Sequence, residues 1–127
     1  AGLFSNTYDI ANYAQMMLNN GVYNGKRIFS NRSISKFTER QNMPINSDFA
    51  LGWDTPSEKG STAGDLFSQY SYGHLGFTGT STWIDCEKRL GIVILTNATK
   101  NFWFERTGLN DIRRSIGSFV WKNYHQF

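Results

Sequence analysis

The sequence predicts an α+β fold, an antiparallel sheet with flanking helices that include a C-terminal helix packed on the sheet. Apolar residues recur at helical spacing near both ends of the chain. Between residues 49 and 96, segments of strand character follow one another and are separated by turn residues. The order helix, helix, strands, helix is typical of α+β proteins. With 127 residues, the chain has the length of a single domain, residues 1–127.

The first helix is predicted to run from a cap at Ser5 or Asn6 to about Asn20. Both cap candidates carry a short side-chain oxygen that can accept hydrogen bonds from the N–H groups of the first turn. Gly21 suits the end of the helix. One face carries apolar residues at helical spacing, namely Ile10, Ala11, Ala14, Met17 and Leu18. We therefore expect an amphipathic helix that packs on the core.

A turn and a second helix are expected next. Asn24 and Gly25 form a dipeptide that is typical of hairpin turns. Ser30 can cap a helix of about ten residues that ends near Gln41.

Four strands are expected in the middle of the chain, at residues 49–54, 67–74, 81–85 and 90–96. A segment rich in Ser, Thr, Gly and Lys at residues 57–64 is expected to be a mobile surface loop. A polar hairpin turn at residues 87–89 precedes the last strand. Because this last strand is continuously apolar and β-branched, we expect it to be buried on both faces at the centre of the sheet.

The end of the chain is predicted to form a loop and then a helix. Residues 97–106 lack strand or helix periodicity, and we expect three exposed aromatic side chains there, Phe102, Trp103 and Phe104. Apolar residues then recur at spacings of three and four, at Leu109, Ile112, Ile116, Phe119 and Val120. We expect this face of the helix to lie across the sheet.

Composition and charge exclude several kinds of function. The net charge is +3, and the basic residues are spread along the chain rather than gathered in a stripe, so we expect no nucleic-acid partner. Cys86 is the single cysteine, which excludes an internal disulfide, and two histidines add too few ligands for a closed zinc site. We expect no metal and no cofactor. No apolar run approaches the ~20 residues of a membrane span.

The candidate site lies in the glycine-rich stretch that contains His74. Gly73 and Gly76 flank this histidine, Gly79 follows three residues later, and a strand begins at Ser81. Glycines beside a strand mark a bulge or a place where a ligand or another backbone comes close. The composition leaves two interpretations open, a histidine that faces a ligand or an incidental histidine in a turn before a hairpin.

Four segments carry a family resemblance, residues 1–5 (AGLFS), 9–11 (DIA), 49–53 (FALGW) and 73–81 (GHLGFTGTS). In this order and spacing they resemble the C-terminal portion of the serine β-lactamase and penicillin-binding-protein superfamily, above all its class C-like, β-lactamase-related hydrolases and esterases. The resemblance covers nearly all of this chain but only the later part of the family's catalytic domain. It implies part of a β-lactamase/transpeptidase-like fold, a periplasmic or extracellular location, and an upstream part of the same polypeptide as partner.

The resemblance also implies roles for the residues around His74. The family carries a Lys-Thr-Gly motif, or its His-Thr-Gly variant, on a strand beside the catalytic serine, and His74-Leu75-Gly76 stands at that position. His74 would supply a cation or a donor, and Gly76 would let the acyl group lie against the strand. The backbone N–H of Phe77 would be an oxyanion donor.

Three further residues would contact the substrate by the same resemblance, Leu75, Thr78 and Gly79. Leu75 replaces the hydroxyl residue of the motif, so a side-chain donor to a substrate carboxylate is missing. This departure suits a hydrolase of a less anionic ester, amide or peptidoglycan-like substrate, or a chain without catalysis.

The nucleophile and base are not recognisable in this chain. Ser33 and Lys36 match Ser-x-x-Lys, but the match follows the AGLFS segment, whereas the family's nucleophile precedes it. Neither Tyr-x-Asn nor Ser-x-Asn occurs. Strand alternation argues against a Ser81-His74-Asp85 triad. We therefore expect a piece of a longer polypeptide that is catalytically silent by itself.

Two alternatives remain open. The chain would be a non-catalytic binding or accessory module of a larger cell-wall or glycan-acting protein, with aromatic residues on a glycan or partner, namely Trp53, Trp83, Trp103 and Phe104. In the other alternative the chain only completes a fold, and a homodimer is expected if an apolar sheet face is exposed.

Overall fold

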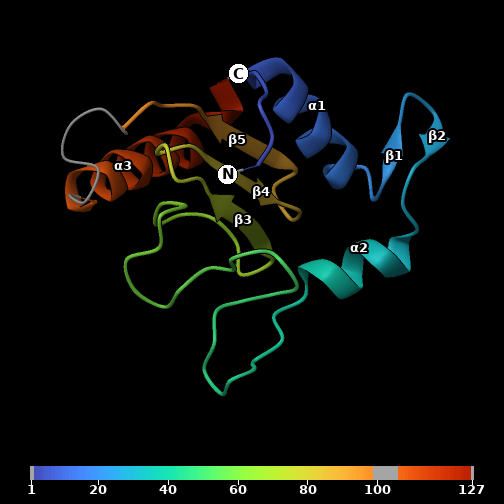
Figure 1. Cartoon of the computed structure of the whole chain (residues 1–127), viewed down its shortest axis with the longest axis horizontal. Coiled ribbons are helices and arrows are strands. Elements are labelled where there is room, and N and C mark those ends of the chain that lie inside the picture. The colour runs from blue at the N-terminus through green and yellow to red at the C-terminus, as the bar shows by residue number, and fades with distance from the viewer. Residues whose placement is uncertain (1, 99–105, 127) are drawn as a thin grey trace.

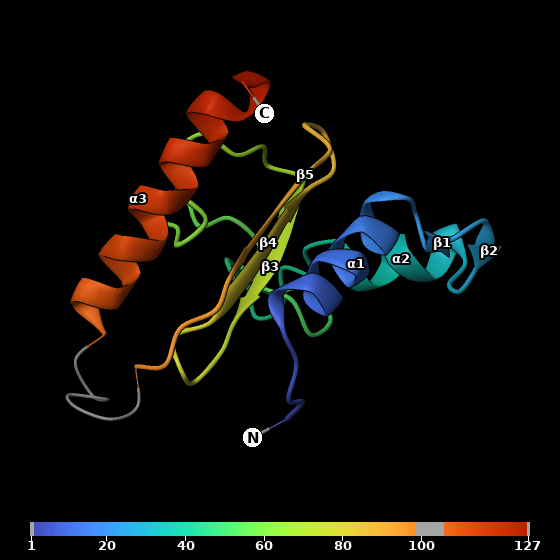
Figure 2. The ribbon, with the colours of Figure 1, turned by 90° about the horizontal axis from the view of Figure 1, so that it is seen from above.

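The computed structural model describes residues 2–98 and 106–126 and has the predicted α+β arrangement. A three-stranded antiparallel sheet is formed by β3 (Ser71–Leu75), β4 (Ser81–Asp85) and β5 (Leu90–Ile94). Three helices accompany the sheet, α1 (Thr7–Leu18), α2 (Asn31–Thr38) and α3 (Thr107–Asn123), and α3 is followed by a short 3₁₀ turn, η1 (Tyr124–Gln126). Viewed from above, α3 lies along one face of the sheet and α1 lies on the other (Figure 2).

The strand order is β3-β4-β5, so β4 is the central strand (Figure 1). Trp83 of β4 lies opposite Gly73 on one side and Ile92 on the other. The prediction that residues 90–96 form the centre was wrong, because among the described residues β5 pairs with β4 alone. A continuous apolar run in the sequence indicates that both faces of a strand are covered. It does not indicate how many strands pair with that strand.

The capped start of α1 confirms one of the two predicted caps. The side-chain oxygen of Asn6 accepts a hydrogen bond from the N–H of Asp9 at 3.0 Å. The buried face differs from the predicted one, because Met16 is buried and Ala11 is exposed. The core on this side of the sheet is formed by Ala14, Met16, Met17, Ile34, Tyr72 and Ile84.

The predicted turn and second helix are also present. Asn24 and Gly25 both have positive φ values, 48° and 74°, and connect the two-residue strands β1 (Val22–Tyr23) and β2 (Lys26–Arg27). Ser30 caps α2 by accepting a hydrogen bond from the N–H of Ser33 at 3.0 Å. The helix ends at Thr38, earlier than predicted, because the following residue adopts an extended conformation.

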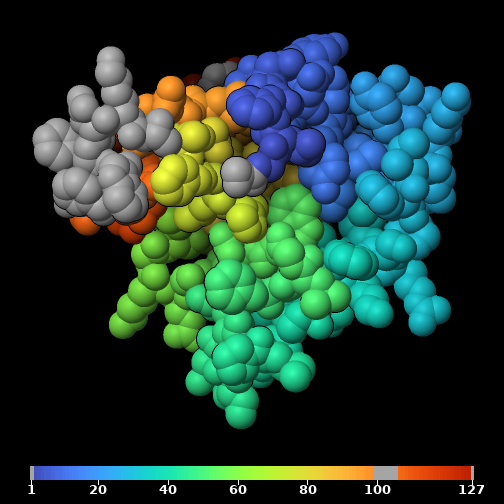
Figure 3. All heavy atoms as spheres, in the orientation of Figure 1, coloured from blue at the N-terminus to red at the C-terminus, as the bar shows by residue number. Residues whose placement is uncertain are grey.

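Two strand predictions were too long or wrong. Residues 49–54 form a turn rather than a strand, closed by a hydrogen bond from the N–H of Ala50 to the carbonyl of Trp53 at 2.8 Å. Residues 67–70 lie outside β3, and Ser68 is used instead to bind the carboxylate of Asp85. The segment between α2 and β3 forms the lobe at the bottom of Figure 3.

The C-terminal helix lies on the sheet as predicted, but with a different face. Its buried residues are Arg113, Gly117 and Trp121. The predicted apolar face is largely exposed, with exposed fractions of 55%, 37% and 62% at Ile112, Ile116 and Phe119. The three aromatic residues expected between 102 and 104 lie outside the described residues.

Part of the predicted surface loop explains this rotation of α3. Ala63 is 1% exposed, and its carbonyl accepts a hydrogen bond from the indole N–H of Trp121 at 2.8 Å. A Cβ at Gly117 would overlap the backbone of Ala63. The helix therefore presents Gly117 and Trp121 to this loop, and the prediction that all of residues 57–64 form a surface loop was wrong.

Candidate functional site

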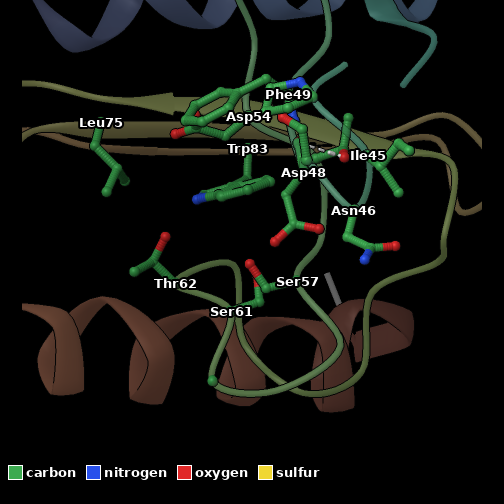
Figure 4. Close-up of a pocket in the computed structure, with 14 residues that line it drawn as sticks. Ile45, Asn46, Asp48, Phe49, Asp54, Ser57, Ser61, Thr62, Leu75 and Trp83 are labelled. Atoms are coloured by element: carbon green, nitrogen blue, oxygen red, sulfur yellow. Dashed lines mark hydrogen bonds between the residues drawn. The ribbon is translucent and has the colours of Figure 1, made fainter. Parts of the chain in front are cut away.

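His74 and Leu75 follow one another in β3 but face opposite sides of the sheet. Tyr72, two residues before His74, is buried in the core that α1 covers. His74 therefore lies on the α1 side, where its side chain is exposed. Leu75 lines a cavity between the sheet and α3, as Figure 4 shows. The two residues do not share a surface, although the resemblance predicts that both contact the substrate.

The outer edge of β3 is joined by Asp54. Its N–H donates to the carbonyl of Gly73 at 2.8 Å, and the N–H of Gly73 donates to the carbonyl of Asp54 at 2.9 Å. Burial raises the pKa of the Asp54 carboxyl, and the nearby charge of His74 lowers it in part. Because Asp54 pairs with Gly73, its side chain lies on the face of Leu75, where it lines the same cavity, and not on the face of His74. Sequence reasoning missed this residue, which directly follows the conspicuous FALGW segment.

The residues after β3 form a tight turn. The N–H of Gly79 donates to the carbonyl of Gly76 at 3.1 Å, and the N–H of Gly76 donates to the carbonyl of Thr80 at 2.8 Å. Phe77 and Thr78 occupy the central positions of this turn. A Cβ at Gly76 would overlap the hydroxyl of Thr80, so the first glycine is required by close packing.

The second glycine is required by conformation as well as by packing. Gly79 has a φ of 93°, which side chains of L-residues rarely adopt, and a Cβ there would overlap the hydroxyl of Thr96. The carbonyl of Thr78 accepts hydrogen bonds from the N–H of Ala98 at 2.8 Å and from Thr96 Oγ1 at 3.0 Å. The chain that leaves β5 therefore braces the turn.

The side chain of Phe77 is exposed, and it interacts with a cation. The guanidinium of Arg106 lies 5.2 Å from the centroid of the Phe77 ring, within the range of a cation–π interaction. This contact connects the start of α3 to the middle of the turn.

A buried arginine of α3 donates hydrogen bonds to backbone carbonyls in and next to the turn at residues 76–79. Arg113 is 3% exposed, and its Nε donates to the carbonyl of Gly79 at 3.1 Å. Its Nη2 donates to the carbonyls of Thr80 at 2.8 Å and Gly76 at 3.4 Å. Burial lowers the pKa of Arg113, and the positive charge of Arg106 lowers it further. An arginine nevertheless remains protonated in proteins.

Sequence reasoning missed the role of Arg113, although a signal was present. Arg113 lies four residues after Leu109 and four residues before Gly117, so all three share a helical face. A charged residue within an otherwise small and apolar face indicates a buried polar partner.

The structure does not assemble a catalytic triad or a nucleophile from the described residues. Asp85 lies on the face opposite His74, because Thr82, the partner of His74 in the register, is an odd number of residues away. Ser81 shares the face of Asp85. Ser33 lies in the first turn of α2, where its hydroxyl is 2.9 Å from the hydroxyl of the cap Ser30.

A cavity lies beside Leu75 on the α3 side of the sheet. Its volume is about 590 Å³, and its lining includes Phe49, Asp48 and Ser57 (Figure 4). The indole of Trp83 projects from the sheet into this region, but it is only 4% exposed. Of the predicted site residues, Leu75 alone lines this cavity.

Comparison with known proteins establishes the family. The fold and the sequence matches are those of the serine β-lactamase and penicillin-binding-protein superfamily. A family model described as Beta-lactamase matches residues 1–113, most of the chain, and the chain belongs to this family of serine hydrolases. Within the described residues, none of the helices combines the length and the apolar character that crossing a bilayer requires.

Relatives and a solved structure agree with this assignment. Proteins from Salmonella typhi and Salmonella agona, each named "Putative D-alanyl-D-alanine carboxypeptidase", are 43% identical over 99 residues. These matches cover 76% of this chain and 22% of each relative, so the chain spans about a fifth of their length. The crystal structure of a beta-lactamase from Mycobacterium bovis matches with a TM-score of 0.73 and 21% identity, over 94% of this chain and 44% of that one.

Proposed function

We propose that this chain is the C-terminal part of a β-lactamase-related serine hydrolase and that it forms one wall of an acyl-transfer site. The observation that carries the proposal is the turn at residues 76–79. This turn follows the edge strand β3 directly, depends on two glycines and is braced by Thr80, by the chain that follows β5 and by α3. A rigid backbone donor of this kind is what an oxyanion site requires, because it is oriented before the reaction begins.

The proposed reaction is acyl transfer to a serine that lies upstream of this chain. The serine attacks the substrate carbonyl, and the N–H of Phe77 stabilises the oxyanion that forms. The alcohol or amine of the substrate leaves with the proton of the serine hydroxyl, a covalent acyl-enzyme results, and water then hydrolyses this ester to release the acid and the free serine. One oxyanion donor typically contributes ~3–4 kcal/mol to the stability of the transition state. His74 supplies a donor or cation on the same strand, and Thr78 and Gly79 shape the wall of the site.

The upstream part of the same polypeptide is the partner that this proposal requires. The chain covers 22% of the relatives' length, which leaves ample sequence in such a protein for the nucleophile and base. A hydroxyl is missing at Leu75, and the structure directs this side chain away from the face of His74. We therefore propose a small ester, amide or peptidoglycan-like substrate without a strictly required carboxylate. A periplasmic or extracellular location is proposed with it.

Covalent labelling tests this function. A polypeptide extended upstream through the serine-bearing segment is expected to be acylated by a fluorescent β-lactam or a p-nitrophenyl ester, and the 127-residue chain alone is expected to remain unlabelled. His74→Ala in the extended protein should slow acylation. Hydrolysis of the ester by the 127-residue chain, abolished by Ser33→Ala, would show instead that the nucleophile lies inside this chain.

The alternative of a glycan-binding module receives less support. Trp83 is buried and stacks on Phe67 with ring centroids 6.2 Å apart, so it is unavailable to a ligand on the surface. Trp53 is half-buried and packs edge-on against Tyr72. Trp103 and Phe104 lie outside the described residues. Shifts of the Trp53 indole resonance during titration with peptidoglycan fragments would favour the module over the enzyme.

A further inference from the structure

We propose that Arg113 is a positioning residue that fixes the peptide plane between Gly76 and Phe77 and thereby aims the N–H of Phe77 away from α3. The orientation of this N–H is inferred from the contacts of the turn. The purpose of that orientation, donation to an oxyanion, rests on the proposed function.

Three of the carbonyls around the turn point toward Arg113. The guanidinium spans Gly76, Gly79 and Thr80, with donor–acceptor distances of 3.4, 3.1 and 2.8 Å. The carbonyl of Gly76 is held a second time by the N–H of Gly79 at 3.1 Å. These contacts restrain the rotation of the peptide units that enter and leave the turn.

Because the peptide between Gly76 and Phe77 is planar and trans, holding the carbonyl of Gly76 also fixes the direction of the N–H of Phe77. In a trans peptide unit the C=O of one residue and the N–H of the next point in opposite directions. Since the carbonyl of Gly76 is held toward Arg113 and the interior of the turn, the N–H of Phe77 is directed to the other side. Arg113 thus acts on a donor that it does not touch.

The chemistry of the side chain explains why an arginine suits this position. The planar guanidinium carries five N–H donors in a fixed arrangement, whereas a lysine ammonium is a compact point charge. Nη1 of Arg113 also donates to Asn110 Oδ1 at 2.9 Å, which orients the guanidinium plane from one turn earlier in α3. Among the described residues, Arg113 donates to carbonyl and amide oxygens, so the group is arranged for geometry rather than for charge pairing.

Amide hydrogen exchange measured by NMR on the 127-residue chain tests the restraint. Arg113→Lys should reduce the protection of the Gly79 N–H at least ten-fold and shift the Phe77 and Thr80 resonances, while the amides of α1 stay unchanged. Asn110→Ala keeps the guanidinium but removes the side-chain oxygen that accepts its hydrogen bond. This variant should reduce the protection of the same amides by a smaller factor. The matched control is Arg114→Gln, because Arg114 also donates to a loop carbonyl, that of Gly60 at 3.0 Å, but does not touch the turn.

A second measurement connects the restraint to the reaction. In the extended polypeptide, Arg113→Lys should lower kcat for ester hydrolysis at least ten-fold with little change in KM, and Arg114→Gln should leave both near their wild-type values. A rise in KM together with a drop in kcat and a global loss of protection would indicate a structural role only and would overturn the proposal.

The two failures remain distinguishable. If the wild-type extended protein is not acylated, the proposed function fails, and the exchange data still decide whether Arg113 orients the turn. Unchanged Phe77, Gly79 and Thr80 amides in folded Arg113→Lys would overturn the positioning role even if the enzyme is active. If that variant does not fold, the milder Asn110→Ala decides by the same amides, and wild-type exchange there counts against the proposal.

Discussion

Ser68 and Asp85 are joined by two hydrogen bonds, each 2.7 Å long, from the N–H and the hydroxyl of Ser68 to the two carboxylate oxygens of Asp85. Asp85 is fully buried, and it also accepts hydrogen bonds from the N–H groups of Glu87 and Lys88 at 3.0 Å each. The carboxylate therefore fixes the residues just before β3 and the turn between β4 and β5.

This arrangement predicts a loss of stability in acid. Burial raises the pKa of Asp85, but the hydrogen bonds from Lys88 and Ser68 together bring its pKa below the ordinary value of 3.8. Because the pKa in the folded state is depressed, the contribution of Asp85 is fully present above the unfolded value and is lost as the pH falls through the folded value. Urea unfolding between pH 7 and pH 2.5 should show this decline below about pH 4.

Substitution of Asp85 should remove both the stability and its dependence on acid. Asp85→Asn is expected to lower the free energy of unfolding by roughly 2–3 kcal/mol at pH 7, since an amide cannot accept the same four hydrogen bonds. Asp111→Asn is a suitable control, because Asp111 is exposed and pairs with Arg114 at 3.2 Å. A stability of Asp85→Asn equal to that of the control would contradict the role assigned to the buried carboxylate.

The glycine at the end of the turn predicts a second effect on stability. Gly79→Ala should lower the free energy of unfolding by about 2–4 kcal/mol, because it combines a positive φ with an overlap against Thr96. Gly25→Ala gives the matched comparison, since Gly25 has a φ of 74° but no neighbour within 4 Å, so only the conformational cost of about 1 kcal/mol applies. Thermal unfolding of both variants measures the difference, and equal losses would show that the packing around Gly79 is loose.

Sequence periodicity predicted the presence of helices and strands more accurately than it predicted which of their faces is buried. The cap at Asn6, the turn at Asn24-Gly25 and the terminal helix are local features, and the sequence therefore indicated them correctly. Ile112 and Arg113 show the limit, because the apolar residue is exposed and the charged residue is buried against backbone carbonyls far away in the sequence.

For the same reason, the sequence alone indicated only some of the residues of the candidate site, whose role remains a proposal. His74 and the glycines of the turn were indicated by composition and by the family motif. The places of Asp54 and Arg113 beside these residues depend on tertiary contacts. Asp54 reaches β3 because the turn at residues 49–54 pairs with that strand, and Arg113 reaches the turn at residues 76–79 because α3 packs there. The orientation of Leu75, away from His74, depends on how the sheet packs between the helices. No short segment contains that information.

His74 should affect reactivity without affecting folding. Its side chain is exposed, so His74→Ala is expected to change the free energy of unfolding by less than about 0.5 kcal/mol. In the extended polypeptide the same change should slow acylation by about 10²-fold, the lower range for a positioned donor or acid. Stopped-flow acylation and urea unfolding of the same variant separate the two effects, and an acylation rate equal to wild type would remove His74 from the site.

The exposed apolar face of α3 predicts self-association. Ile112, Ile116 and Phe119 lie at spacings of four and three, so they form one stripe, and we expect the 127-residue chain to associate as its concentration rises. Ile116→Glu should shift light scattering toward the monomer. Ile45→Glu places the same charge on an exposed apolar residue in the lobe between α2 and β3 and should leave association unchanged. A strict monomer at high concentration would contradict the homodimer.

Leu75 offers the sharpest test of the arrangement of β3. If the side chain at position 75 contacted the substrate, Leu75→Thr would restore the hydroxyl donor of the family motif. The extended enzyme would then prefer anionic substrates more strongly. In the structure, however, Leu75 lines the same cavity as Trp83, on the face opposite His74. We therefore expect Leu75→Thr to cost about 1–2 kcal/mol of stability through lost apolar burial and to leave the ratio of kcat/KM for anionic and neutral esters unchanged. A ten-fold gain for the anionic ester would show that the side chain at position 75 reaches the substrate.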